Sequence, residues 1–285
     1  MKIGAVLVNT GCDNNCLFCP GLPAVSEYEL QKIEMKIASN TELFLRDKIS
    51  TIEVSGADLC SYKDLWKLLG YLNDRFQEVR LSTHGKCIYK HISELIKSGV
   101  KEVKIPLYGP SPEIHRKIAR GDVNGEVFKS LRALKDSGIK ITITSLITKY
   151  NYEHLSELYD FARQFTPRIN IGMPFILKPE EFYIPYRQVG SVVRKLIEAK
   201  REPNILDIPR VIGKEYEHFY SSKPPELGNE QPPDMLKTHI KNTPSYRLKM
   251  RMPICANCIY KGKCDGFLQN DIKFYGAGDW RPFNG

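Results

Sequence analysis

Short apolar runs alternate with longer amphipathic stretches along the first 175 or so residues of the chain. The short runs are rich in β-branched residues and predict strands, whereas apolar positions that recur every three to four residues predict helices. The predicted strands are Ile3–Val8, Thr51–Ser55, Val79–Thr83, Val103–Tyr108, Lys140–Leu146 and Ile169–Met173. The predicted helices are Glu34–Leu45, Tyr62–Asn73, Ile88–Lys97, Gly125–Asp136, Tyr152–Gln164 and Arg187–Lys200.

This alternation predicts the fold class. Strands that alternate with helices pair in parallel through right-handed crossovers, which gives an open barrel or a doubly wound sheet. A closed eightfold barrel usually needs about 250 residues for the barrel alone. In a chain of 285 residues, six units therefore predict an α/β fold with a partial (β/α)6, TIM-like barrel.

The character of the sequence changes towards its end, and we predict three parts. Residues 1–200 form the partial barrel, and residues 201–250, rich in Pro, Lys and aromatic side chains, form an irregular connecting segment. Residues 251–285 hold a group of cysteines and form a small C-terminal extension.

Composition restricts the environment of the protein. Apolar residues make up 42% and charged residues 26%, which is typical of a globular chain. No apolar run is long enough to cross a bilayer, and the first residues do not resemble a secretion signal, so we expect a cytoplasmic protein without membrane contact. The net charge of +9 favours an acidic partner such as nucleic acid, a phosphorylated metabolite or an acidic peptide. No compact basic run with interleaved aromatics is present, so nucleic acid is not favoured.

Six of the eight cysteines fall in two tight groups, which in a cytoplasmic chain is more typical of metal binding than of disulfides. The first group, Cys12, Cys16 and Cys19, has the spacing CxxxCxxC directly after the first predicted strand. Three thiolates satisfy three irons of a cubane cluster and leave the fourth open. A structural zinc site would require four ligands. The loop also leaves its strand at the carboxyl end, where active sites of parallel sheets lie.

With Phe18 in the aromatic position before the third cysteine, this motif resembles the signature of the radical S-adenosylmethionine (SAM) superfamily. The resemblance covers residues 3–175 in the order of the elements. It implies a partial barrel and a [4Fe–4S] cluster on the three cysteines, with SAM bound to the open iron. An electron from an external flavodoxin- or ferredoxin-like donor would then cleave SAM to a 5′-deoxyadenosyl radical.

The same resemblance assigns cofactor contacts to the ends of the other strands. Gly56, Ala57 and Asp58 stand where the family often has a Gly-Gly-Glu element, although an ordinary strand-to-helix turn is the alternative. Lys104 could equally be a solvent-facing strand residue, and His115 is interpreted as an ordinary residue near a helix N-terminus. The further candidate cofactor positions are Phe18, Thr83, Lys104, Ser145, Gly172 and Met173.

The second group, Cys255, Cys258 and Cys264, has the spacing CxxCxxxxxC. It resembles the core of the SPASM or Twitch extension of radical maturases, which implies one auxiliary [4Fe–4S] cluster. It departs from the full pattern because Leu268 stands where a further cysteine is expected. A zinc hook is the alternative. The fourth iron could take Cys60, Cys87, Asp265 or the substrate, although free cysteines usually pack as small hydrophobes.

A primary carbon radical abstracts hydrogen from unactivated C–H bonds, so the protein must exclude water and fix the substrate. Because SPASM-like extensions accompany peptide maturases, the leading hypothesis is modification of a peptide or protein side chain. The alternative within the superfamily is a small-molecule dehydrogenase or cofactor-biosynthesis enzyme. Pterin-forming members also have two three-cysteine groups, but they end in a Gly-Gly tail that this sequence lacks. A hypothesis from another class, a non-catalytic zinc protein that binds nucleic acid, explains the charge and the tail cysteines but not the first loop.

Overall fold

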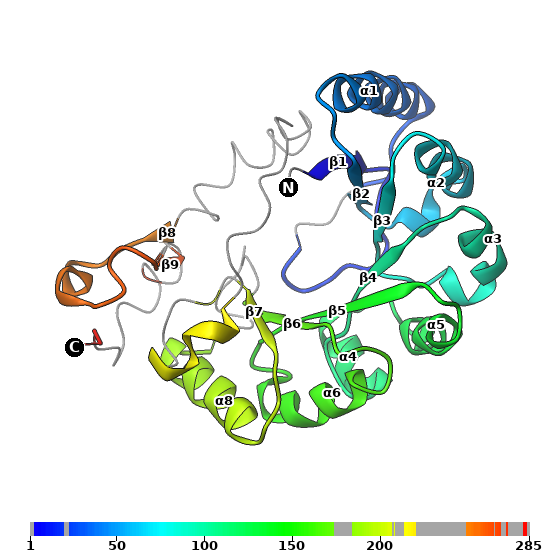
Figure 1. Ribbon diagram of the computed structural model, residues 1–285. Coiled ribbons are helices and arrows are strands. Elements are labelled where there is room, and N and C mark those ends of the chain that lie inside the picture. The colour runs from blue at the N-terminus through cyan, green and yellow to red at the C-terminus, as the bar shows by residue number, and fades with distance from the viewer. Residues whose placement is uncertain are drawn as a thin grey trace.

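The computed structural model describes residues 3–19, 23–173, 184–206, 208, 214–220, 249–264, 266–268, 272 and 282–283. Seven of the described strands form one parallel sheet in chain order, and each pairs with the next. The sheet curves as an open arc with β1 and β7 at its two edges and the helices along its outer side (Figure 1). These strands are β1 (Ile3–Val8), β2 (Thr51–Gly56), β3 (Glu78–Ser82), β4 (Glu102–Pro106), β5 (Lys140–Leu146), β6 (Ile169–Gly172) and β7 (Asn204–Leu206).

The predicted partial barrel is confirmed, and a doubly wound sheet is not, because the helices lie along one side of the arc. The sheet also continues to β7, beyond the expected boundary at residue 200. Two predicted helices begin with a short 3-10 turn, at Ile88–Lys90 and at Tyr152–His154. The helices are α1 (Glu27–Arg46), α2 (Leu65–Asn73), α3 (Ile92–Lys97), α4 (Pro112–Ile118), α5 (Glu126–Lys135), α6 (Leu155–Ala162) and α8 (Tyr186–Glu198). No helix in the described ranges is both long and apolar enough to cross a membrane.

The two faces of the sheet differ in chemistry because strand side chains alternate. One face carries fully buried aliphatic residues such as Val54, Leu81 and Ile105, which join the hydrophobic core with the helices. The opposite face turns into the barrel and is polar. There Lys104 pairs with Glu53, so Lys104 lies in the lumen and not on an outer solvent-facing surface.

A polar network occupies the amino-terminal end of the lumen. Arg80 contacts Glu78 at 3.1 Å and Glu102 at 3.5 Å, and Arg168 lies 3.7 Å from the same Glu102 carboxylate. Thr142 donates its hydroxyl to the other oxygen of Glu102. Each charge taken from water in this layer therefore has a partner, which is the condition under which buried charges are tolerated.

The first helix begins at Glu27 rather than at Glu34, because Ser26 forms a capping box. The Ser26 hydroxyl accepts a hydrogen bond from the amide of Glu29, whose carboxylate accepts one from the amide of Ser26 at 2.8 Å. We expect Ser26→Ala to lower the free energy of unfolding by about 1 kcal/mol, measured by urea denaturation. Ser93→Ala, an exposed position inside α3, is the matched control, and an equal loss there would contradict the capping assignment.

Candidate active site

The first cysteine loop follows β1 and is held by backbone hydrogen bonds from a distant part of the chain. The amide of Leu17 donates to the carbonyl of Ile118 at 3.0 Å, and the amide of Gly121 donates to the carbonyl of Asn14 at 2.7 Å. Within the loop, the amide of Cys19 donates to the carbonyl of Cys16. The end of α4 and the segment after it therefore fix the loop over the carboxyl ends of the strands.

The three thiols of this loop lie near one another but differ in their exposure to solvent. Cys16 is buried with 4% of its surface exposed, Cys12 is half-buried and Cys19 is exposed. Burial, with smaller contributions from the neighbouring Cys19 and Cys12, raises the pKa of Cys16 to about 12. A free thiol at Cys16 is therefore protonated at neutral pH, and coordination to a metal would compensate the charge of its thiolate.

Polar groups lie beside two of these sulfur atoms. The side-chain amide of Asn14 donates to Cys12 Sγ at 3.5 Å, and His84 Nε2 lies 3.5 Å from Cys16 Sγ. Soft thiolates suit an iron–sulfur cluster, in which each thiolate binds a different iron. In the described part of the chain, no three His, Cys, Asp or Glu side chains converge on a single metal ion. The donor set thus fits a cubane on Cys12, Cys16 and Cys19.

Aromatic rings surround the buried thiol. Phe18 packs edge-on against Tyr108 with ring centroids 5.6 Å apart, and Tyr108 stacks on His115 at 5.3 Å. Cys16 and Tyr108 share a small apolar cluster with Ile118. An apolar shell of this kind excludes water and lowers the dielectric constant around a metal centre.

His115 lies inside α4 and is almost fully buried. The sequence alone indicates an ordinary residue near a helix N-terminus and does not predict this burial. Its Nδ1 accepts a hydrogen bond from the amide of Tyr108 at 3.0 Å, and its Nε2 lies 3.6 Å from the carboxylate of Asp122. Asp122 in turn accepts from the amides of Glu126 and Val127 at the start of α5. These contacts hold Tyr108 in place. No sequence motif predicts them, because the residues come together only in the folded chain.

Burial, with a smaller effect from His84, lowers the pKa of His115 to about 3. The unfolded chain binds this proton first, near pH ~6.5. The contribution of His115 to stability is therefore complete above that pH and is lost as the pH falls towards the folded-state value. We expect His115→Asn, whose side-chain oxygen can still accept from Tyr108, to flatten the dependence of unfolding free energy on pH by up to about 1.4 kcal/mol per pH unit. Urea denaturation between pH 7.5 and about 5 measures the slope, and equal slopes in both proteins would contradict the prediction.

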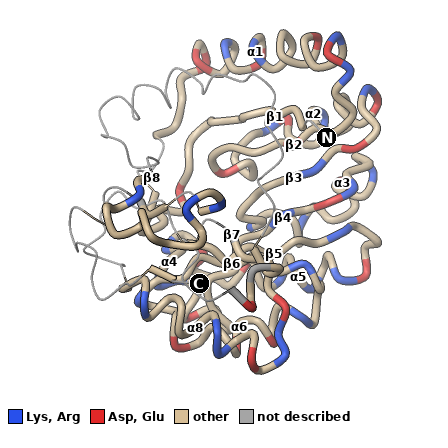
Figure 2. The backbone as a smooth tube through the Cα atoms, turned by 60° about the vertical axis from the view of Figure 1, so that its left-hand side comes forward, with Lys and Arg blue, Asp and Glu red and all other residues tan. Residues whose placement is uncertain are grey.

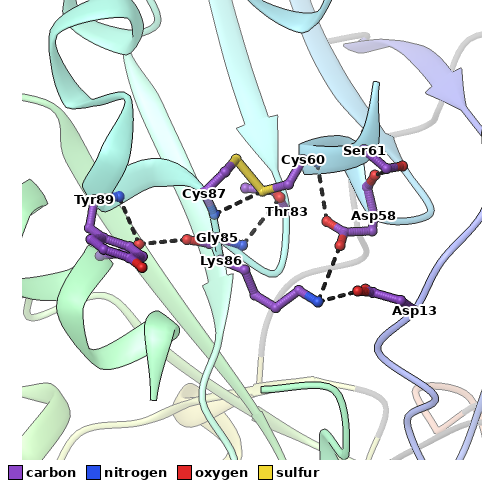
Figure 3. Close-up of a disulfide and its surroundings, with 10 residues drawn as sticks. Asp13, Asp58, Cys60, Ser61, Thr83, Gly85, Lys86, Cys87 and Tyr89 are labelled. Carbon is purple, nitrogen blue, oxygen red and sulfur yellow. Dashed lines mark hydrogen bonds and ion pairs between the residues drawn. A yellow bond between two sulfur atoms is a disulfide. The ribbon is translucent and has the colours of Figure 1, made fainter. Parts of the chain in front are cut away.

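The loop after β2 contacts the cysteine loop directly. The amide of Asp58 donates to the carbonyl of Gly11 at 3.2 Å, and Asp58 is buried. Lys86, from the loop after β3, lies 3.5 Å from the Asp58 carboxylate and 2.6 Å from that of Asp13 (Figure 3). Burial raises the pKa of Asp58, and the Lys86 ammonium opposes that shift. The segment 56–58 is therefore part of a three-loop contact, and its role towards SAM stays a prediction.

The remaining candidate cofactor positions follow the other strands. Thr83 is buried, and its hydroxyl accepts from the amide of Gly85. Ser145 shares a strand face with Ile143, which packs in the core, and its buried hydroxyl has no hydrogen-bond partner among the described residues. The other two positions are Gly172, whose carbonyl accepts from Ile147, and Met173, which is buried. The structure places all of them at carboxyl ends of strands, and their contacts with a cofactor stay predictions.

An open cavity of about 640 Å³ lies against the cysteine loop, and Cys12 and Asp58 line it. Cys60 and Cys87 line the same cavity and form a disulfide with a Cα–Cα distance of 5.5 Å. The interpretation of these two residues as ordinary buried thiols is therefore wrong. They follow β2 and β3, which pair directly, so the sheet brings their loops together.

The second cysteine group forms its own site. The antiparallel strands β8 (Lys249–Met250) and β9 (Phe267–Leu268) pair and bring the flanks of the group together. Burial raises the pKa of Cys255, and the nearby Cys264 and Cys258 contribute to the same direction, so the three thiols are neighbours. They line one pocket together with Arg251 and Lys261.

The candidates for a fourth ligand to this group are changed by the structure. Cys60 and Cys87 are joined to each other, and their loops lie across the barrel from β8 and β9 (Figures 1 and 2). They are therefore not ligands of the second group in this structure. Asp265, the other protein candidate, lies outside the described residues.

Comparison with known proteins gives both family and fold. A model of the radical SAM superfamily matches residues 6–162, more than half of the chain. The GTP 3′,8-cyclase of Aquifex aeolicus (strain VF5) is 24% identical over 239 residues, covering 79% of this chain and 68% of the cyclase. The GTP 3′,8-cyclase of Rhizobium leguminosarum bv. trifolii (strain WSM2304) is 25% identical over 167 residues, covering 55% of this chain and 47% of the cyclase. The chain thus spans about half to two thirds of the length of these relatives.

Two solved structures have a similar fold. The protein anSMEcpe with bound AdoMet and the Cp18Cys peptide aligns with a TM-score of 0.52 at 15% identity, covering 70% of this chain and 60% of that one. Streptococcus suis SuiB bound to the precursor peptide SuiA aligns with a TM-score of 0.50 at 17% identity, covering 72% and 48%. At these identities the likeness is one of fold alone.

Proposed function

This chain belongs to the radical SAM superfamily, and we propose that the radical SAM enzyme it forms acts on a small phosphorylated molecule of the purine-nucleotide class. The similarity to GTP 3′,8-cyclase carries this proposal. Its alignment extends over 239 residues, whereas the family model matches only residues 6–162. The similarity therefore includes positions outside the part that matches the superfamily model.

The charges of the chain support a phosphorylated substrate. The net charge is +9, and Arg251 and Lys261 line the pocket of the second cysteine group. Arg251 donates through Nε to the carbonyl of Cys264 at 3.1 Å, which fixes its guanidinium beside the thiols. Basic side chains beside these thiols suit the negative charge of a cluster. Their pocket has a volume of about 20 Å³, so the phosphates of a nucleotide would meet these side chains at its rim.

Cys12, Cys16 and Cys19 hold the first [4Fe–4S] cluster in this proposal, and Cys255, Cys258 and Cys264 hold an auxiliary one. When bound, the first cluster supplies the electron, received from a flavodoxin- or ferredoxin-like donor, that cleaves SAM. Phe18 and Tyr108 keep water from the buried thiol, and Asp58 and Lys86 fix the loop that carries it. We assign cofactor contacts to Gly56, Ala57, Asp58, Thr83, Lys104, Ser145, Gly172 and Met173.

The tail motif gives a second candidate function. Its CxxCxxxxxC spacing resembles the SPASM or Twitch extension, which favours a peptide side chain as substrate. The relatives named as nucleotide cyclases support the small-molecule alternative better than this leading hypothesis from the sequence. We therefore rank the peptide substrate second.

The proposal can be tested with reconstituted enzyme, SAM and dithionite in the absence of oxygen. GTP, ATP, guanosine and a set of peptides are then added separately as candidate substrates. We expect a purine nucleotide to stimulate release of 5′-deoxyadenosine and, when deuterated, to transfer deuterium into it. Stimulation by peptides but not by nucleotides would overturn the proposal.

Lys261→Ala should raise the KM for the nucleotide about tenfold, because a charged phosphate contact is lost, and should leave substrate-independent SAM cleavage unchanged.

A further inference from the structure

The disulfide between Cys60 and Cys87 joins the loop after β2 to the loop after β3 (Figure 3). Both cysteines are only half-buried, and both line the open cavity of about 640 Å³ beside the first cysteine loop. Lys86 and Lys90 line the same cavity together with the carboxylates of Asp13, Asp58 and Glu126, and Lys86 pairs with the first two of these. A partly exposed disulfide at an open cavity is typical of labile bonds rather than of buried structural ones.

The joined loops are the ones that fix the first cysteine loop. Asp58, two residues before Cys60, donates its amide to Gly11 and contacts Lys86. Lys86, directly before Cys87, reaches Asp13 at 2.6 Å. The disulfide therefore closes a ring of contacts that runs from Asp58 through Lys86 to the loop of Cys12.

We propose that Cys60 and Cys87 form a thiol–disulfide exchange site, reduced by a dithiol protein of the thioredoxin class that binds at this cavity. An incoming thiolate attacks Cys87 Sγ, the S–S bond breaks, and Cys60 leaves as a thiolate. The second thiol of the reductant then attacks the mixed disulfide and releases Cys87. The reductant becomes a disulfide, and its two protons and two electrons end on the two cysteines.

A backbone hydrogen bond gives the direction of attack. The amide of Cys87 donates to Cys60 Sγ at 3.0 Å. A donor at this distance stabilises negative charge on Cys60, and the better stabilised sulfur is the better leaving group. Reduction separates the two loops and loosens the contacts of Asp58 and Lys86 with the cysteine loop. The site therefore couples thiol redox state to the loop that holds the first cluster.

Peptide mapping tests the exchange itself. Trypsin releases Cys60 in residues 49–63 and Cys87 in residues 87–90, so a disulfide appears as one linked pair. We expect this pair after equilibration with oxidised dithiothreitol, and its loss when reduced thioredoxin acts on the folded chain without denaturant. Absence of the pair at every ratio of oxidised to reduced dithiothreitol, or reduction only in denaturant, would overturn the proposal.

A trapping experiment tests the direction of attack. Thioredoxin whose resolving cysteine is replaced by serine should accumulate as a mixed disulfide on residues 87–90. An adduct on residues 49–63, or no adduct, would contradict attack at Cys87.

The coupling between the redox state of Cys60 and Cys87 and the loop of Cys12 can be measured without radical chemistry and without the substrate. In the full-length chain before cluster assembly, we expect iodoacetamide to alkylate Cys12 severalfold faster when the pair is reduced. Cys264, at the other site, is the internal control and should not change. The double variant Cys60→Ser, Cys87→Ser should show the fast rate in both oxidised and reduced buffer. Equal Cys12 rates in all four samples would overturn the coupling.

Discussion

Cys16→Ala is expected to abolish release of 5′-deoxyadenosine, with a loss of more than about 100-fold, or about 2.7 kcal/mol in the activation barrier. Cys16 is the most buried thiol of its group, and Cys12 and Cys19 flank it. If Cys16 holds one iron of the proposed cluster, alanine leaves that iron without its protein ligand. Release of 5′-deoxyadenosine by liquid chromatography, together with iron and sulfide content, measures the effect.

The matched control removes one thiol from the other group. Cys258→Ala should keep an N-terminal cluster whose electron paramagnetic resonance signal changes when SAM is added, and Cys16→Ala should lose that response. Retention of both the response and the activity in Cys16→Ala would refute the assignment of the cluster to this loop. Stoichiometric zinc without sulfide in the reconstituted protein would do the same.

Gly56→Ala is expected to destabilise the chain by about 3 kcal/mol and to disturb the first cysteine loop. Gly56 has a φ of 153°, and a Cβ at this position would lie 2.1 Å from the carbonyl oxygen of Val8 in the neighbouring strand. The obstacle is backbone, which cannot rotate away as a flexible side chain could. The next residue, Ala57, also donates its amide to the carbonyl of Val8 at 3.2 Å. The clash therefore falls at the carboxyl ends of β1 and β2, directly before the loops that follow them.

Gly70→Ala provides the control for this prediction. Gly70 lies inside α2, and a Cβ there would meet no atom within 4 Å. Because alanine is the better helix former, we expect a gain of about 0.5–1 kcal/mol. Urea denaturation of the three proteins measures both effects, and equal stabilities for the two variants would show that the strand-end conformation does not require glycine.

The sheet could be predicted because its strands carry a strong local signal. β1 and β5 begin and end where the sequence pattern places them. The three-residue β7 was not predicted, since so short a strand has no periodicity to detect. The early start of α1 depends on Ser26 and Glu29, whose reciprocal hydrogen bonds outweigh the polar character of the first turns.

The first cysteine group could be predicted because three residues within one loop carry its chemistry. The contact of Lys86 with Asp13 and Asp58 could not, because it joins three loops that only the parallel sheet brings together. The same holds for His115 and Asp122. For Cys60 and Cys87 the expectation of reduced cytoplasmic thiols was misleading, and a separation of 27 residues gives no hint of pairing.

The polar network at the amino-terminal end of the barrel restricts how small molecules can reach the lumen. Arg80, Glu102 and Arg168 are tied to one another across three strands. Passage through that end would require the buried Glu102 carboxylate to separate from its arginine partners, at considerable energetic cost. We therefore expect a small molecule to reach the described part of the barrel from the carboxyl ends of the strands, where the first cysteine loop lies.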